Sequence, residues 1–404
     1  ASPGVLVREV DLTIGNVDAT SGSIGALVAP FTKGPVEEPQ LIENEEDLLQ
    51  TFGQPYSIDN HYEYWMVASS YLSYGGTMQV IRANDAGLKN ATEDGAPELL
   101  IKSDTHYNQL GYDDNIITGT VIAAKTPGSY ANGIRVSIID GKADQILTTT
   151  GISTVGMGVT QSVANRVVAG AGGTSLLDGY LKGIVTGIPE AGKVEVKVLS
   201  HVSAAGTVTN VDYQANGVYC FKANELLSAS LAGTNVSAAT TSAITNQVDW
   251  FEQQEIVLTT KDGNGNPIKL EWDALADAPG TSSYAQARGA RHDELHVVVI
   301  DDKGTITGNA GTILEKHLNL SKAKDAEYSV GSTAYWRKYL ATNSQYIYGG
   351  SAPAGITTSG FTAGTATAIG NLDADSGWDQ DASEVNFGLS GVVTASLAGG
   401  TNYG

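Results

Sequence analysis

Two stretches of this sequence repeat one pattern and decide the fold: Pro127-Gly128-Ser129-Tyr130-Ala131 leading to Ile134-Arg135-Val136-Ser137-Ile138-Ile139-Asp140, and Pro279-Gly280-Thr281-Ser282-Ser283-Tyr284-Ala285 leading to Leu295-His296-Val297-Val298-Val299-Ile300-Asp301. Each has a Pro-Gly turn, a Tyr-Ala step and a β-branched run that ends in Asp. The first run alternates apolar and polar residues from Ile134 to Ile138, as a strand with one buried face does. The second is apolar from Val297 to Ile300, which indicates burial on both faces. We predict two strands of one sheet, with residues 141–290 inserted between them.

Length and charge limit the possible functions. The 404 residues are too many for one core, so roughly two to four domains are expected. The chain has 44 acidic and 23 basic residues and a formal charge of −21. Binding to nucleic-acid phosphates or to an anionic membrane surface is disfavoured, because both need clustered Lys and Arg. No Lys or Arg occurs between Gly34 and Ile81 or after Lys338. Such acidic surfaces either meet basic patches on another copy or simply keep the protein soluble.

Cysteine usage and hydropathy exclude further classes. Cys220 is the only cysteine, so the chain is not a disulfide-stapled secreted domain. No apolar run reaches the ~20 residues of a membrane-spanning helix, so no membrane insertion is expected. The N-terminus lacks a signal-peptide pattern, because Arg8, Glu9 and Asp11 interrupt it early. We expect a soluble protein that was made in a reducing compartment or has no need of oxidation.

The predicted fold class is α+β and multidomain, with a mixed α/β core sheet, inserted mainly-β domains and an extended N-terminal arm. Residues 1–20 form the arm, which is strand-like but has no neighbouring strand in the sequence. It either adds a strand to another subunit or is a frayed terminus. The residues that would make this inter-subunit contact are Val5, Leu6, Val7, Arg8, Val10 and Leu12.

Residues 21–85 are predicted to be a compact α/β unit. A short strand at Ile24–Ala29 precedes a helix that Asn44 caps and that runs through Thr51, with acidic residues at its start. A second helix is expected at Asp59–Tyr74 and a strand at Met78–Ala83. The face of the second helix that should be buried carries Tyr64, Val67, Ala68, Tyr71 and Leu72.

We assign residues 21–85, 119–140 and 291–350 to one core domain, 86–118 to a small excursion and 141–290 to an outward-facing insertion domain. Within the insertion we predict two hairpins and two helices: Val194–Val198 with Val208–Val211, Glu255–Thr260 with Ile268–Trp272, and helices at Ala223–Leu231 and Ala239–Glu252. Beyond Asp301 we predict helices near Thr312–Leu318 and Ser332–Leu340 and a strand at Tyr346–Tyr348. Residues 351–404 form a Gly-, Ala- and Thr-rich segment leading to a C-terminal domain that this sequence does not include.

Three motifs have the spacing of chemical sites, and each has a simpler explanation. Residues 187–194 match a phosphate-binding loop, but Val194 replaces the magnesium-binding hydroxyl and a strand follows, so a hairpin turn is the preferred interpretation. His292 and His296 lie four residues apart but lead into a strand, where they would be about 13 Å apart, too far to share a zinc ion. They are better explained as a structural or solvent-facing pair. Asp262–Asn266 begins like a calcium loop and then departs from it, which favours a turn. We therefore expect no catalytic residue, cofactor or metal.

The order of several motifs resembles the tail sheath proteins of contractile bacteriophages, in particular the T-even and cyanophage types. The resemblance extends from residue 2 to about residue 350. The motifs that carry it are Ser2-Pro3-Gly4-Val5, Thr51-Phe52-Gly53-Gln54-Pro55, Tyr71-Leu72-Ser73-Tyr74-Gly75, Val80-Ile81-Arg82-Ala83, the two Pro-Gly stretches quoted above, and Asp293-Glu294-Leu295-His296-Val297-Val298-Val299.

The resemblance implies a structural, non-enzymatic protein of the virion tail, assembled in the host cytoplasm. Subunits would stack as hexameric rings around a tail tube, between baseplate and tail terminator proteins, and contract to drive the tube through the host envelope. Terminal arms would add strands to neighbouring subunits, which fits the strand-like arm.

Members of this family continue well beyond the point matched by Leu389–Gly404, so the chain is either truncated or unusually short. The alternatives are the sheath of a phage-derived contractile injection system and, in a different class, an acidic surface-layer or adhesin-like protein.

Overall fold

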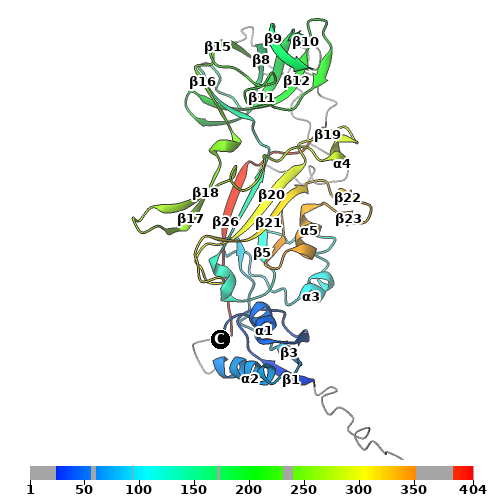
Figure 1. Ribbon diagram of the computed structural model, residues 1–404, viewed down its shortest axis with the longest axis vertical. Coiled ribbons are helices and arrows are strands. Elements are labelled where there is room, and N and C mark those ends of the chain that lie inside the picture. Colours follow the sequence, from blue (N-terminus) through cyan, green and yellow to red (C-terminus); the bar gives the residue numbers. More distant parts are fainter. Residues whose placement is uncertain are drawn as a thin grey trace, which may run out of the picture.

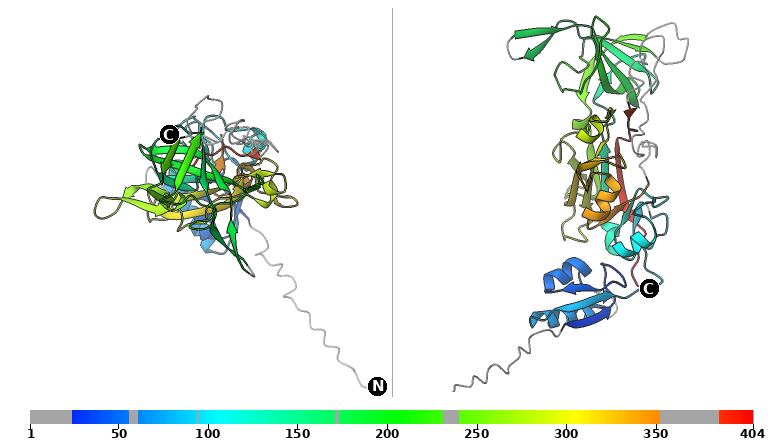
Figure 2. Two further views of the ribbon diagram at one scale, coloured as in Figure 1. Left: turned by 90° about the horizontal axis from the view of Figure 1, so that it is seen from above. Right: turned by 90° about the vertical axis from the view of Figure 1, so that its right-hand side faces the viewer.

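The computed structural model describes residues 24–55, 61–93, 95–170, 173–230, 240–351 and 385–403. The predicted arm lies outside these ranges. The described part is elongated, with three sheets one after another along its long axis (Figures 1 and 2). A small α/β unit occupies one end, a seven-stranded sheet the middle and an eight-stranded sheet the other end. The fold is thus α+β, strand-rich and multidomain.

The two strands predicted from the repeated pattern are hydrogen-bonded neighbours. They are β6 (Ile134–Asp140) and β20 (Glu294–Asp301), which pair antiparallel with Val297 opposite Ile138. Residues Val297–Ile300 are fully buried on both faces of the sheet. One face packs in a core around Trp336, and the other in a core around Trp250 and Trp272. Burial on both faces explains why this run is apolar without alternation.

The seven-stranded sheet gathers strands from distant parts of the sequence. All its neighbouring strands are antiparallel, in the order β21-β20-β6-β26-β4-β5-β24. The remaining bounds are β4 Thr92–Glu93, β5 Ile122–Ala124, β21 Thr312–Ser321, β24 Ile347–Gly349 and β26 Val392–Ala398. The helix predicted near Thr312–Leu318 is wrong, because these residues form β21 at the edge of this sheet. Strand β26 comes from the Gly-, Ala- and Thr-rich segment and lies directly beside β6 (Figure 1).

Short elements surround this sheet. They are α3 (Asp104–Gln109), α4 (Ser283–Gln286), α5 (Trp336–Asn343), the 3₁₀ turn η2 (Ser129–Gly133), the hairpin of β22 (Glu327–Ser329) and β23 (Ser332–Thr333), and the parallel pair of β19 (Ala290–Arg291) and β25 (Val385–Asn386). Helix α5 and strand β24 confirm the helix and strand predicted near the end of the core, with shifted bounds.

The eight-stranded sheet lies entirely within residues 145–249 and is antiparallel. Its strands are β7 (Gln145–Thr148), β8 (Gly158–Ser162), β11 (Tyr180–Glu190), β12 (Lys193–Val202), β13 (Val208–Asn210), β14 (Leu226–Ser230), β15 (Thr240–Ala243) and β16 (Asn246–Asp249). The hairpin of β9 (Arg166–Gly170) and β10 (Gly173–Leu177) projects from it. The two helices predicted in this region are wrong. Their residues form β14, β15, β16 and the 3₁₀ turn η3 (Phe251–Gln253).

Both hairpins predicted in the insertion exist. Strand β12 pairs with β13 through Ser200–Val202, further along the strand than predicted. The second hairpin consists of β17 (Glu255–Lys261) and β18 (Pro267–Glu271), which project sideways from the molecule (Figure 1).

The N-terminal unit has the predicted order of strand, helix, helix and strand, with one additional short strand. Its elements are β1 (Gly25–Ala29), β2 (Gln40–Ile42), α1 (Glu45–Phe52), α2 (His61–Ser73) and β3 (Met78–Arg82). The sheet is mixed, because β3 pairs parallel with β1 and antiparallel with β2. The Asn44 side chain caps α1 by accepting a hydrogen bond from the amide of Asp47 at 2.9 Å, as predicted. Among the helices in the described ranges, none has the length and apolar character to cross a lipid bilayer.

Candidate functional site: exposed apolar faces and the junctions between units

Two faces of the N-terminal unit expose large apolar side chains. Helices α1 and α2 cover one face of the sheet, where Val80 and Met78 are buried with Trp65, Ala68 and Leu72. No described residue covers the opposite face to that extent, and there Val28 is 63% and Leu41 51% exposed. Strands β1 and β2 are both edges of this sheet. An uncovered apolar sheet face with two open edges is typical of a surface that another chain covers.

Helix α2 is apolar on its outer side as well. The prediction of its buried face is only partly right. Ala68 and Leu72 are buried as predicted, together with Trp65, whereas Tyr64 and Val67 are 45% and 58% exposed. Within α2 the only acidic or basic residue besides His61 is Glu63. The exposed large side chains on and next to this helix are Tyr62, Tyr64, Met66, Val67 and Tyr74. A helix that is apolar all round is normally buried, so this side also indicates an interaction surface.

The N-terminal unit is attached to the middle sheet by a buried arginine. Arg82, at the end of β3, is fully buried and donates hydrogen bonds to the carbonyl oxygens of Gly34 at 2.9 Å and Pro127 at 2.6 Å. Its Nε also donates to the hydroxyl of Tyr403 at 3.2 Å, and that hydroxyl donates to the carbonyl of Ala83 at 2.7 Å. One side chain thus connects three segments that are far apart in the sequence.

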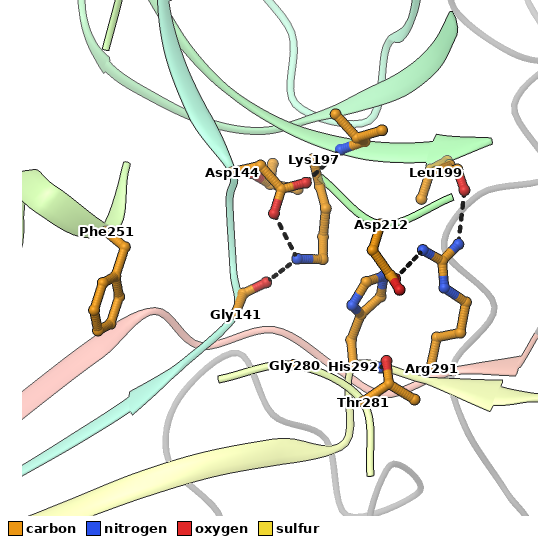
Figure 3. A network of polar contacts seen from close by, with 12 residues as sticks. Gly141, Asp144, Lys197, Leu199, Asp212, Phe251, Gly280, Thr281, Arg291 and His292 are labelled. Carbon is orange, nitrogen blue, oxygen red and sulfur yellow. Dashed lines mark hydrogen bonds and ion pairs between the residues drawn. The ribbon is translucent and has the colours of Figure 1, made fainter. Parts of the chain in front are cut away.

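The junction between the middle sheet and the eight-stranded sheet contains two cations, Lys197 and Arg291, each with its own set of contacts (Figure 3). The Lys197 ammonium, on β12, donates to the carbonyl of Gly141 and lies 3.3 Å from Oδ1 of Asp144. The Arg291 guanidinium, on β19, donates to the carbonyl of Leu199 at 2.7 Å and to Asp212 at 3.2 Å. These contacts join the chain entering the insertion and the chain leaving it to the same strand of the eight-stranded sheet.

His292 lies in this junction between the two cations (Figure 3). Its backbone φ is +60°, a left-handed conformation that is uncommon for a residue other than glycine. The residue is 7% exposed, and burial, together with the charges of Lys197, Arg291 and Lys322, lowers the pKa of its imidazole well below the usual value of 6.5. The ring is therefore neutral at physiological pH.

The aspartates that end β6 and β20 hold the backbone of the segments around them. Asp140 is fully buried, pairs with Lys322 and accepts hydrogen bonds from the amides of Ser390 and Gly391 at 2.7 and 2.8 Å. Asp301 is equally buried and accepts from the amides of Thr305, Ile306 and Thr307. The repeated Asp thus has a structural role that the sequence pattern did not reveal.

In the described residues, the three motifs that have the spacing of chemical sites serve the fold: two are hairpin turns and the third is a pair of buried histidines. Residues 187–194 include the β11–β12 turn, in which Glu190 pairs with Lys193, so the hairpin interpretation is confirmed. His296 accepts a hydrogen bond from the amide of Asn319 at 3.0 Å, so its Nε2 donates to the carbonyl of Asp277 at 2.9 Å. Both histidines are buried rather than solvent-facing. The Asp262 carboxylate accepts from the amides of Asn264 and Asn266, as a hairpin turn requires. The described residues contain no group of three or more His, Cys, Asp or Glu arranged to hold a metal ion.

Comparison with known proteins links the chain to sheath proteins. No protein-family model matches it. The chain is 36% identical over 84 residues to the tail sheath protein of Enterobacteria phage T4, a match that covers 21% of this chain and 12% of the phage protein. A solved structure of a sheath tail protein from Listeria innocua aligns with 57% of this chain and 35% of its own length, at 16% identity and a TM-score of 0.18. That score is too low to carry an argument. The sequence similarity supports a structural role of the sheath type.

Proposed function

We propose that the chain is a structural, non-enzymatic subunit of the contractile tail sheath of a bacteriophage. The observation that carries this proposal is the 36% identity over 84 residues to the T4 tail sheath protein. In this proposal, subunits stack as hexameric rings around a tail tube, between a baseplate and a tail terminator. They contract to drive the tube through the host envelope. The protein would assemble in the host cytoplasm and remain in the virion tail.

Contraction requires subunits that transmit force without coming apart internally. The buried cations at the junctions support this role, because each connects backbone from several segments. Arg82 attaches the N-terminal unit to the middle sheet, and Lys197 and Arg291 attach the eight-stranded sheet. Removing such a donor leaves a buried carbonyl oxygen without its hydrogen bond, which costs about 1–3 kcal/mol for each group. We therefore propose that residues 21–85, 119–140 and 291–350 act as one core, with 141–290 as an outward-facing insertion.

The N-terminal arm would keep neighbouring subunits connected during the motion. Its apolar residues Val5, Leu6, Val7, Val10 and Leu12, with Arg8 between them, would add a strand to a sheet of the next subunit. The open edges of β1 and β2 and the uncovered apolar face beside them support this proposal. Strand addition gives affinity through main-chain hydrogen bonds and specificity through alternate side chains.

Electron microscopy of purified particles tests the proposal. Tails whose main band in mass spectrometry is this chain should show six-fold symmetric cross-sections around a central tube. Averaged cross-sections without six-fold symmetry, or tails from which this chain is absent, would contradict the proposed assembly.

A further inference from the structure

Arg337 is a buried cation for which the described part of the chain supplies no counter-ion. The residue is 6% exposed, at the start of α5. One of its terminal nitrogens donates to the carbonyl of Asn115, and the other lies 3.5 Å from the hydroxyl of Tyr335. Its Nε has no hydrogen-bond partner among the residues that the structure describes. Among the described residues, no carboxylate oxygen lies within the 4.0 Å of an ion pair. Buried charges are normally paired, so this guanidinium indicates a missing anion.

The neighbouring tyrosines do not supply that negative charge. Tyr107 and Tyr335 both contact Arg337 through their hydroxyls. Burial raises the pKa of Tyr107 to about 12 and also raises the pKa of Tyr335. Both phenols are therefore neutral at physiological pH. They can donate or accept hydrogen bonds, but they cannot balance the arginine.

The helix that carries Arg337 adds positive potential at the same place. Helix α5 starts with no side-chain cap and has no acidic residue in its first turn, which instead contains Arg337 and Lys338. Cations at a helix N-terminus oppose the helix dipole, whereas an anion there is favourable. The arrangement lowers the stability of the helix start unless a negative group lies beside it.

A cavity of about 450 Å³ opens between α3 and α5 at this point. Arg337, Lys338, Lys324 and the hydroxyl-bearing Thr333 line it, and this volume lies within the range of small-molecule sites. Three aspartates also line it. The carboxylate of Asp104 forms an ion pair with Lys125 at 3.4 Å and accepts a hydrogen bond from the hydroxyl of Tyr348. Asp114 is 3.9 Å from Lys338, and both Asp113 and Asp114 are exposed.

We propose that the cavity between α3 and α5 is an oxyanion-binding site in which a carboxylate or phosphate group neutralises Arg337. Lys338 and Lys324, which line the same cavity, and the positive end of the α5 helix dipole add to its recognition. The oxyanion belongs either to a free small molecule or to an acidic side chain of a second copy. The site does not depend on the proposed sheath role, because it is defined within one subunit.

Calorimetric titration of the full chain with inorganic phosphate, at constant ionic strength, tests whether the oxyanion comes from a free small molecule. We expect binding to the wild-type protein and a loss of affinity of about tenfold or more in Arg337→Gln, the effect of removing one charge-assisted hydrogen bond. The matched control is Arg288→Gln, because Arg288 is exposed and stacks on Tyr284 away from the cavity. Lys338→Gln keeps the buried arginine and should weaken binding less than Arg337→Gln does.

Arg337→Met separates binding from folding. A buried charge without a counter-ion carries a desolvation cost that an apolar side chain removes, so in anion-free buffer this variant should melt no lower than the wild type. Phosphate should raise the melting temperature of the wild type and of Arg288→Gln, but not that of Arg337→Met.

Sedimentation velocity tests whether the oxyanion comes from an acidic side chain of a second copy. If phosphate does not bind and Arg337→Gln abolishes self-association that Arg288→Gln retains, the anion comes from a second copy. The proposal is overturned if phosphate affects wild type and Arg337 variants equally. It is also overturned if neither phosphate binding nor self-association depends on Arg337.

Discussion

Asp140 and Lys322 form an ion pair in which both side chains are fully buried and 2.8 Å separates Oδ2 from Nζ. The pair joins the end of β6 to the segment after β21. Lys322 also donates to the carbonyl of Gly388 at 2.9 Å, and Asp140 accepts from the amides that lead into β26. Three segments of the chain, which lie at Asp140, at Lys322 and at Gly388–Gly391, therefore meet at one ionic contact.

Removing one partner of this pair should destabilise the protein strongly. We expect Asp140→Asn to lower the free energy of unfolding by about 3–5 kcal/mol, because an uncompensated buried ammonium remains. Urea unfolding followed by circular dichroism measures this change. Lys193→Met is the control, since its pair with Glu190 is exposed and should contribute no more than about 1 kcal/mol. The double variant Asp140→Asn/Lys322→Met should recover part of the loss. Equal effects of Asp140→Asn and Lys193→Met would show that the buried pair does not hold the segments together.

His292 should make stability depend on pH in the acid range. Its pKa is lowered in the folded protein, so below about pH 6.5 the unfolded chain binds a proton that the folded chain does not. Stability therefore falls as pH falls through this value. Asn tolerates a positive φ, so His292→Asn should fold and show a shallower decline in melting temperature between about pH 7 and pH 5. Parallel curves for the two proteins would contradict the assignment. His296, whose pKa is also lowered, is common to both proteins and cancels in the comparison.

The two-sided burial of β20 predicts a large cost for truncating it. Ile300 is fully buried in the core with Trp250 and Trp272. Ile300→Ala should lower the free energy of unfolding by about 2–5 kcal/mol, from lost apolar burial and the cavity left behind. Val330→Ala, at a fully exposed position of the β22–β23 turn, should stay within about 0.5 kcal/mol of the wild type. The same chemical denaturation experiment compares them, and a small loss in Ile300→Ala would argue against a core on that face.

Val7→Pro tests the proposed strand addition by the arm. Proline has no backbone N–H and is excluded from paired positions of a strand, so assembly into tails should fail while the melting temperature stays unchanged. Val330→Ala, which lies outside the arm at a fully exposed position, is the control and should assemble. Electron microscopy of particles made with each variant gives the readout. Intact tails from Val7→Pro would mean that this arm makes no main-chain contact at that residue.

Local signals in the sequence predicted the elements whose stability is local. Asn44 caps α1 because its side chain and the amide of Asp47 are neighbours in the chain. That β6 and β20 belong to one sheet was predictable because both runs are rich in β-branched residues, and the full burial of Val297–Ile300 leaves no polar alternation in β20. The hairpin at Asp262–Asn266 follows from turn residues that satisfy each other.

The elements that were predicted wrongly, and the contacts that were not predicted, depend on residues far apart in the sequence. Residues 312–321 carry apolar side chains at spacings that also fit a helix. They form a strand because they hydrogen-bond to the edge of β20 that β6 does not use. The contact of Lys197 with Asp144 joins positions 53 residues apart, and that of Arg291 with Leu199 joins positions 92 apart. No pattern within a short window encodes such contacts. The absence of a carboxylate beside Arg337 among the described residues likewise depends on what surrounds it in space, and no sequence pattern indicates it.

Immunogold electron microscopy of the native particle, with antibody against residues 141–290, tests the sheath proposal most directly. The account predicts label along a tail that shortens and thickens on triggering. Label on a cell envelope, or along a fibre of fixed length, would contradict it and favour a surface protein instead.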